Sequence, residues 1–152
     1  MMAILVLLQV VHVLFLSFHD WVPIPPWNDV DAAREHDGVA RLAVVTAIST
    51  APFVLGLIFT LANLRGGLPA WVLAWLWGTY GLLFLGALRA WWWPYLLRPE
   101  PSRAVRYSAL FSRTHSFLPE RHGFSPNSLH CAYHAFTAGT LVVLATVTLW
   151  AQ

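Results

Sequence analysis

Apolar residues gather in four long runs along the chain, separated by one very short polar segment and two long ones. The runs cover residues 3–18, 42–64, 68–88 and 129–150. An α-helix needs about 20 apolar residues to cross the hydrocarbon core of a bilayer, and each run approaches or exceeds that length. The pattern predicts an all-α integral membrane protein, a four-helix antiparallel transmembrane bundle. We expect its spans at about 2–19, 40–64, 68–93 and 126–150.

The connections between the runs predict how the chain is oriented. Segment 63–67 has room only for a tight turn, so the polar loops 20–39 and 94–125 lie together on the opposite side. That side holds eight of the nine arginines and all seven acids. The positive-inside rule places both loops in the cytoplasm and both termini outside. We therefore expect one domain, 1–152, in a bacterial-type inner membrane or plasma membrane.

Composition supports the membrane prediction and excludes several functions. The chain is 58% hydrophobic and 11% charged, unlike an ordinary soluble domain. The arginines lie beside the spans rather than in one soluble patch, so we expect no nucleic acid partner. The single cysteine, Cys131, excludes an internal disulfide and a CxxC redox pair. The first run lacks a basic segment before it and a small-residue cleavage site, so we expect a retained span rather than a signal peptide.

Local signals predict short interfacial helices in the two polar loops. Asn28 is a candidate cap for a helix over 29–36, and Ser102 for a helix reaching about residue 115. Ser125 followed by Pro126 is typical of a helix start and predicts where the last span begins. Pro52 predicts a kink in the second span.

The chain is rich in tryptophan, and most of these residues form two groups on the third span. Trp71, Trp75 and Trp77 lie near its outer end, and 91–93 lie near its inner end. Aromatic belts at the two membrane surfaces have this arrangement. We expect these side chains to anchor the span at the interfaces.

The histidines favour a site between the first and last spans. His12 and His19 are seven residues apart, and His130 and His134 are four apart, so each pair shares one helix face. Polar side chains at membrane depth usually have a function. If the two helices touch, the four imidazoles form a cluster near the cytoplasmic face.

Imidazole binds borderline metals and haem iron, which suggests two versions of the site. One is a b-type haem bound by His12 and His134. The other is an iron, copper or zinc centre bound by His19, His130 and His134, with His115 and His122 reaching it from the second loop. Asp20 and Glu120 can reach the same entrance and complete the coordination shell. Either version suits a redox or lipid-modifying protein, an oxidoreductase acting on a lipid or quinone-like substrate. The pattern identifies no catalytic residue and leaves open whether the protein is an enzyme.

Two other functions fit the same sequence. The histidines can be satisfied by backbone carbonyls, hydroxyls or water in a non-catalytic accessory subunit, within a homo-oligomer or a larger membrane complex. Alternatively, Arg103, Arg106 and Arg113 form one stripe that can bind anionic lipid headgroups, or the head of an anionic amphiphile that the protein carries.

Known catalytic motifs are missing from the sequence. It contains no HExxH, no glycine-rich phosphate loop and no serine nucleophile elbow. The segment 50–53, Thr-Ala-Pro-Phe, resembles the second helix of the membrane-associated eicosanoid and glutathione metabolism family. Thr46 and Ser49 stand where that family has Asn and Glu, so we do not assign the chain to it.

Overall fold

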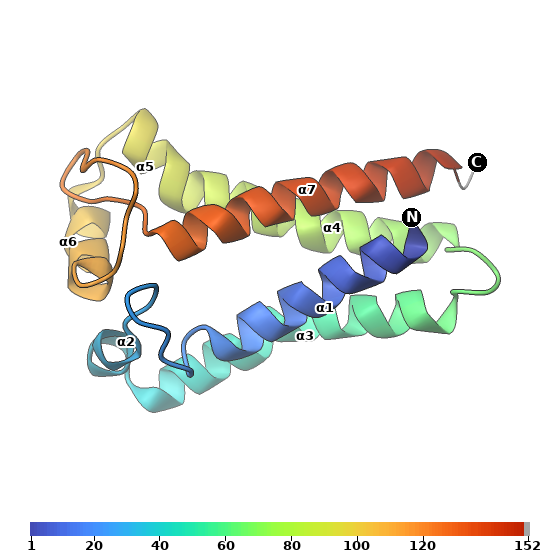
Figure 1. Ribbon diagram of the computed structural model, residues 1–152, viewed down its shortest axis with the longest axis horizontal. Helices are drawn as coiled ribbons and strands as arrows, with labels where there is room; N and C mark the ends of the chain where they lie inside the picture. Colours follow the sequence, from blue (N-terminus) through green and yellow to red (C-terminus); the bar gives the residue numbers. More distant parts are fainter. Residues whose placement is uncertain (151–152) are drawn as a thin grey trace.

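Four long helices lie side by side in the computed structural model, which describes residues 1–150 (Figure 1). They are α1 (Met2–Phe18), α3 (Val39–Ala62), α4 (Ala70–Ala87) and α7 (Ser128–Trp150). A π-helical turn, η1 (Leu88–Trp92), and α5 (Trp93–Leu96) continue α4. Two short helices, α2 (Val30–Asp37) and α6 (Pro101–Phe111), lie in the loops. There is no strand within residues 1–150, so the all-helical prediction is confirmed, while the last two residues of the predicted domain lie outside the described part.

Three of the helices are long and apolar enough to cross a membrane. They are α3, the continuous helix Ala70–Leu96, and α7. α1 is apolar but shorter, with 17 residues. Length and composition therefore identify three candidate spans, with α1 as a shorter apolar helix packed among them.

The long helices pack as a closed ring in which each helix contacts two others. α1 packs on α3 and α7, and α4 packs on the same two helices. Leu5, Val72, Leu76 and Leu144 are fully buried in the core. Because α1 contacts α7, the histidines of the first and last helices lie on neighbouring elements.

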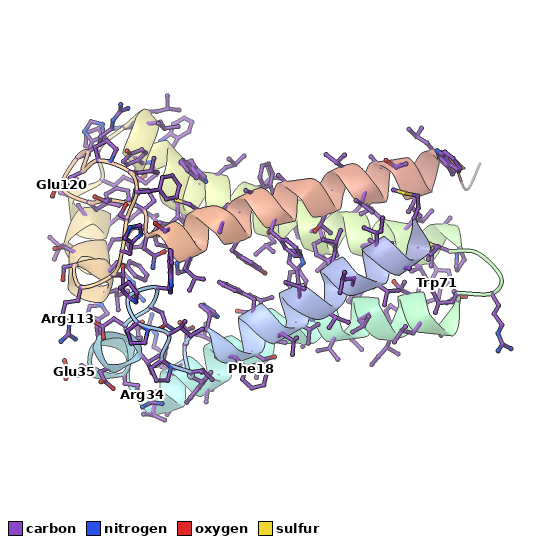
Figure 2. The ribbon with its side chains drawn as sticks, viewed as in Figure 1. Phe18, Arg34, Glu35, Trp71, Arg113 and Glu120 are labelled. Carbon is purple, nitrogen blue, oxygen red and sulfur yellow. The ribbon has the colours of Figure 1, made fainter. Side chains whose placement is uncertain are left out.

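Charged side chains gather at the end of the ring formed by the two loops. Figure 2 shows Arg34, Glu35, Arg113 and Glu120 at this end, while Trp71 lies at the other. Both termini of the described chain lie at the end with the α3–α4 turn (Figure 1). The molecule thus has one polar end and one apolar end.

The short helices begin and end differently from the sequence prediction. Asp29, not Asn28, caps α2, because its carboxylate accepts the Ala32 N–H at 3.0 Å. Gly38 has a φ of 76°, which lets the chain turn directly from α2 into α3. The predicted capping by Ser102 is also wrong, since Glu100 is the N-cap residue of α6 and the helix ends at Phe111.

Candidate functional site

The π-helical turn positions two tryptophans inside the polar end. Pro94 has no N–H, so it cannot bond the carbonyl of Ala90 four residues earlier. The Tyr107 hydroxyl donates to that carbonyl instead, at 3.1 Å, and ties α6 to the end of α4. The Trp93 N–H bonds to Leu88 O, five residues back. Wide turns of this kind often occur at functional sites, and this one contains Trp91 and Trp92.

Both tryptophans contact histidines of α7. The Trp91 ring stacks on His130, with centroids 4.5 Å apart and an interplanar angle of 26°. The Trp92 Nε1–H donates to His134 Nδ1 at 3.2 Å. Trp91 is buried, so the prediction that it anchors the span at the membrane surface is wrong. Trp71, Trp75 and Trp77 are exposed, and their role as membrane anchors stays a prediction.

Asn127 fixes which nitrogen of His130 carries the proton. It is 1% exposed, and its Nδ2 donates to the Trp27 carbonyl at 3.3 Å, which sets the orientation of the amide. Its Oδ1 accepts from the backbone N–H of His130 at 3.0 Å and from His130 Nδ1 at 2.7 Å. A neutral imidazole with a proton on Nδ1 presents a lone pair at Nε2. Asn127, rather than the predicted Ser125, therefore caps α7.

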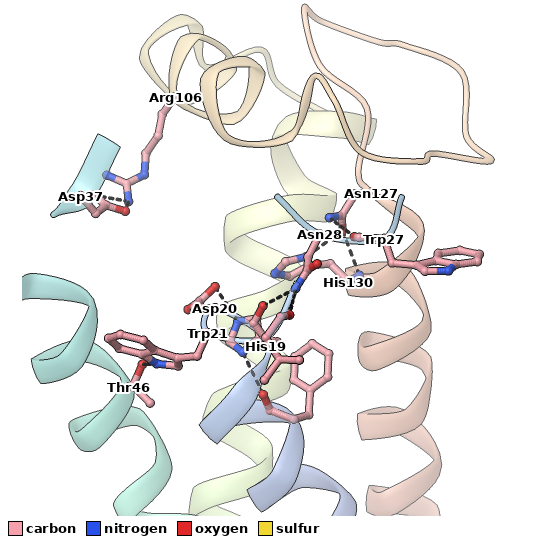
Figure 3. A network of polar contacts seen from close by, with 12 residues as sticks. His19, Asp20, Trp21, Trp27, Asn28, Asp37, Thr46, Arg106, Asn127 and His130 are labelled. Carbon is pink, nitrogen blue, oxygen red and sulfur yellow. Dashed lines mark hydrogen bonds and ion pairs between the residues drawn. The ribbon is translucent and has the colours of Figure 1, made fainter. Parts of the chain in front are cut away.

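His19 lies opposite His130, at the end of α1. Its Nδ1 donates to the Phe15 carbonyl at 2.9 Å, and its Nε2 lies 3.3 Å from Oδ1 of Asp20. The rings of His19 and His130 have centroids 5.9 Å apart. Figure 3 shows both rings beside Asp20 and Asn28, whose Nδ2 donates to the carbonyl of His19 at 2.6 Å.

His19, Asp20, Asn28 and His130 line a cavity of about 360 Å³ between the loops and the end of the bundle, in which charged and apolar side chains are mixed. Two of its acids are paired with arginines. Asp37 accepts two bonds from Arg106 and lies 3.4 Å from Arg41, and Asp29 pairs with Arg113 at 2.6 Å. Within the described residues, Asp20 has no arginine partner.

An apolar groove of about 350 Å³ lies directly behind the cavity, between α1, α4 and α7. Leu82, Leu83, Gly86 and Ala87 line it from α4. His19, Trp91 and His130 line both the groove and the cavity. The same three side chains therefore lie between a cavity that contains charged groups and a groove lined mainly by apolar side chains.

His12 lies in the aromatic core, away from both spaces. It is fully buried among Phe53, Tyr80, Tyr133 and Phe136, whose ring centroids lie 4.8–6.0 Å away. Its Nδ1 bonds to Leu8 O at 2.8 Å, and its Nε2 lies 3.2 Å from the Thr137 hydroxyl. His134 instead bonds to Trp92 and lines the groove. In this fold both nitrogens of His12 are bonded to protein groups, so neither is free for a haem shared with His134.

The remaining predicted metal ligands lie apart from His19 and His130. His115 Nδ1 bonds to Ser128 at 2.8 Å, and its backbone N–H bonds to Pro26 O, so it joins the two loops. His122 is exposed in a turn, with a φ of 55°. Among residues 1–150, no group of three or more histidines, cysteines or acids is arranged to hold a metal ion. Metal binding stays a prediction.

The three arginines of the predicted stripe contact three different acids. Arg106 and Arg113 bond to Asp37 and Asp29, and Arg113 lies beyond the end of α6. Arg103 bonds to Glu100 at 2.9 Å, which lowers the pKa of that carboxyl and raises the pKa of the guanidinium. The structure therefore does not bring these arginines together around one anion.

The sequence pattern missed Trp91 and Asn127 as parts of the site. It named Asp20 only as a loop residue able to reach the histidine cluster, and the structure has Asp20 beside His19. The positions of Trp91 and Asn127 depend on the π-helical turn and on the contact between the loops.

Comparison with known proteins gives no match to any family model, curated protein or solved structure.

Proposed function

We propose that the protein is an integral membrane protein with four spans, and that it binds an amphiphilic molecule at the polar end of its bundle. The three long apolar helices support the membrane location. α1 packs against two of them along their length and, with 17 residues, approaches the length of a span. The polar loops lie at one end, where they would face the cytoplasm.

One observation carries the binding proposal, namely the wall that the cavity and the groove share. Ligand sites are concave and mostly apolar, with a few polar groups that orient the ligand. His19 and His130 supply such groups at the boundary between a cavity that contains charged side chains and an apolar groove. An amphiphile would place its polar head in the cavity and its tail in the groove.

This proposal keeps the lipid or quinone-like ligand predicted from the sequence. It places that ligand between the cavity and the groove rather than at a metal or haem centre. A metal or haem redox protein needs ligands that converge on one point, and the described residues offer no such group. An anionic head needs unpaired cations, whereas the arginines of the cavity bond to Asp37. An accessory subunit remains compatible with the fold but explains neither the cavity nor the groove.

Filling the groove tests the proposal. A Cβ at Gly86 would meet no heavy atom within 4 Å, so Gly86→Leu starts a bulky side chain in open space at the groove. Gly78→Leu is the matched control, because Gly78 is equally unobstructed on the same helix and does not line the groove. Both changes replace glycine within a helix and should not weaken it.

The measurement is mass spectrometry of organic extracts from purified native protein and both variants, with elemental analysis of the same samples. We expect an amphiphile in near-stoichiometric amount with the native protein and Gly78→Leu, and its loss in Gly86→Leu. Equal amounts in all three proteins, or none in any, would contradict the proposal. Stoichiometric iron, copper or zinc would favour the metal hypothesis instead.

A further inference from the structure

Two polar groups at the head of the site, on His130 and Asp20, are hydrogen-bond acceptors. His130 Nε2 carries a lone pair because Asn127 holds the proton on Nδ1, and no donor among residues 1–150 lies within hydrogen-bond distance of it. Asp20 is a carboxylate in contact with His19 alone. In neutral His19, the Nε2 lone pair faces an Asp20 oxygen at 3.3 Å, so two acceptors oppose each other. A ligand that donates hydrogen bonds would satisfy all three groups.

Several donors around the cavity are engaged by the protein. Arg41 and Arg106 both contact Asp37. The Tyr107 hydroxyl donates to Ala90, and burial raises the pKa of that hydroxyl, which keeps it protonated. The Asn28 amide donates to two carbonyls. Other N–H groups of Arg41 and Arg106 stay available to a ligand, and a hydroxyl can accept from them as well as donate, whereas a carbonyl can only accept.

The charges around the cavity are balanced. Asp20, Asp29 and Asp37 line it, and three arginines contact the last two of them. An anionic head therefore gains no net charge partner, and a cationic head would find only Asp20. Trp91, Tyr107 and Phe111 add an aromatic wall suited to a flat ring.

We infer that the ligand of this site is a neutral aromatic diol with an apolar tail, of the hydroquinone type. This inference rests on the proposed amphiphile site. Hydroxyl groups would donate to His130 Nε2 and to the His19–Asp20 pair, while the tail would occupy the groove. The corresponding quinone has carbonyl acceptors in place of these donors. The site should therefore prefer the reduced form to the oxidised form.

The test compares two ligands that differ only in those donors. Native protein in phosphatidylcholine nanodiscs is titrated, without oxygen, with a benzohydroquinone carrying an n-decyl tail and with its benzoquinone. Hydrogen bonds to a charged group contribute more than neutral ones, so we expect the hydroquinone to bind about tenfold more tightly. Asp20→Asn and His130→Phe each remove one acceptor and should reduce this preference to about threefold or less. His36→Gln, in an exposed histidine of α2, should leave it unchanged.

Each other result has a defined meaning. If both forms bind equally, or the quinone binds more tightly, the inference is wrong while the amphiphile site stands. The inference is also wrong if the preference for the hydroquinone survives in both Asp20→Asn and His130→Phe. It is equally wrong if n-dodecylamine or dodecyl phosphate displaces the hydroquinone at a lower concentration than the hydroquinone itself needs to bind. If neither form binds, the inference is wrong. The proposed function then still stands if extracts of Gly78→Leu contain another amphiphile that extracts of Gly86→Leu lack.

Discussion

At the scale of single residues, hydrogen-bond partners decide what each histidine can do. His12 and His130 are both enclosed by aromatic rings, yet only His130 keeps a free lone pair. His12 bonds through both nitrogens, to Leu8 and Thr137, which satisfies it within the core. Asn127 bonds to Nδ1 of His130 and leaves Nε2 without a partner, in a residue that lines the cavity. A neighbouring amide thus separates a structural histidine from a binding one.

Glu100 offers a test of electrostatics outside the spans. Its hydrogen bonds to Arg103 and Arg89 lower its pKa below the ordinary value of 4.5. A lowered pKa in the folded state contributes stability above the unfolded pKa, and that stability is lost as the pH falls through the folded pKa. Glu100→Gln should therefore be less stable than native protein at neutral pH, and the difference should vanish in acid.

Denaturant unfolding of both proteins across the acidic range, followed by circular dichroism, measures that difference. Glu120→Gln is the matched control, since Glu120 is exposed in the second loop and forms no ion pair with any described residue. A difference between native protein and Glu100→Gln that stayed constant down to the lowest pH would show that the ion pairs of Glu100 do not stabilise the fold.

At the scale of elements, one glycine sets how closely α3 and α4 approach. A Cβ at Gly56 would lie 3.0 Å from Leu76 Cδ2 and 3.5 Å from the Trp75 ring. Leu76 is fully buried and has little room to move. Gly56→Ala should therefore force the helices apart, and overpacking of this kind costs about 1–3 kcal/mol. Small residues at helix interfaces in membranes have this role.

Gly78→Ala provides the comparison, because its Cβ would meet nothing within 4 Å. It should be neutral or raise stability by about 0.5–1 kcal/mol through helix propensity. The free energy of unfolding in mixed micelles of increasing SDS content measures both variants. Equal stability of Gly56→Ala and Gly78→Ala would show that the contact between α3 and α4 can accommodate an extra methyl group without loss of stability.

The sequence predicted the helices better than the site because the two depend on different information. Run length and polarity predict each long helix directly. The spacing of His19 and His130 also placed them at one end of neighbouring helices, where the structure has them. The π-helical turn could not be predicted in this way, since it depends on Pro94 freeing a carbonyl for Tyr107, a residue of another helix. Asp29 caps α2 in place of Asn28, because the Asn28 side chain bonds to the carbonyls of His19 and Val22.

At the scale of the whole molecule, polarity is divided between the two ends. The cavity, both short helices and the ion pairs lie at the loop end, and fully buried leucines and valines fill the core. A ligand at the shared wall would therefore sit near one membrane surface, with its tail toward the interior. Access to the groove would come from the bilayer, and access to the cavity from the aqueous side.

This division makes the orientation of the chain testable. Eight of the nine arginines lie on the loop side, and only Arg65 lies at the α3–α4 turn, so the loops should stay in the cytoplasm. Single cysteines at Glu35, Ser102 and Gly66, each in a Cys131→Ser background, can be labelled in bacterial spheroplasts with a membrane-impermeant maleimide. We expect labelling of Gly66→Cys in intact spheroplasts, and of Glu35→Cys and Ser102→Cys only after permeabilisation. Cys131→Ser alone controls for background. Labelling of Glu35→Cys without labelling of Ser102→Cys would place the two loops on opposite sides and contradict an even number of spans between them.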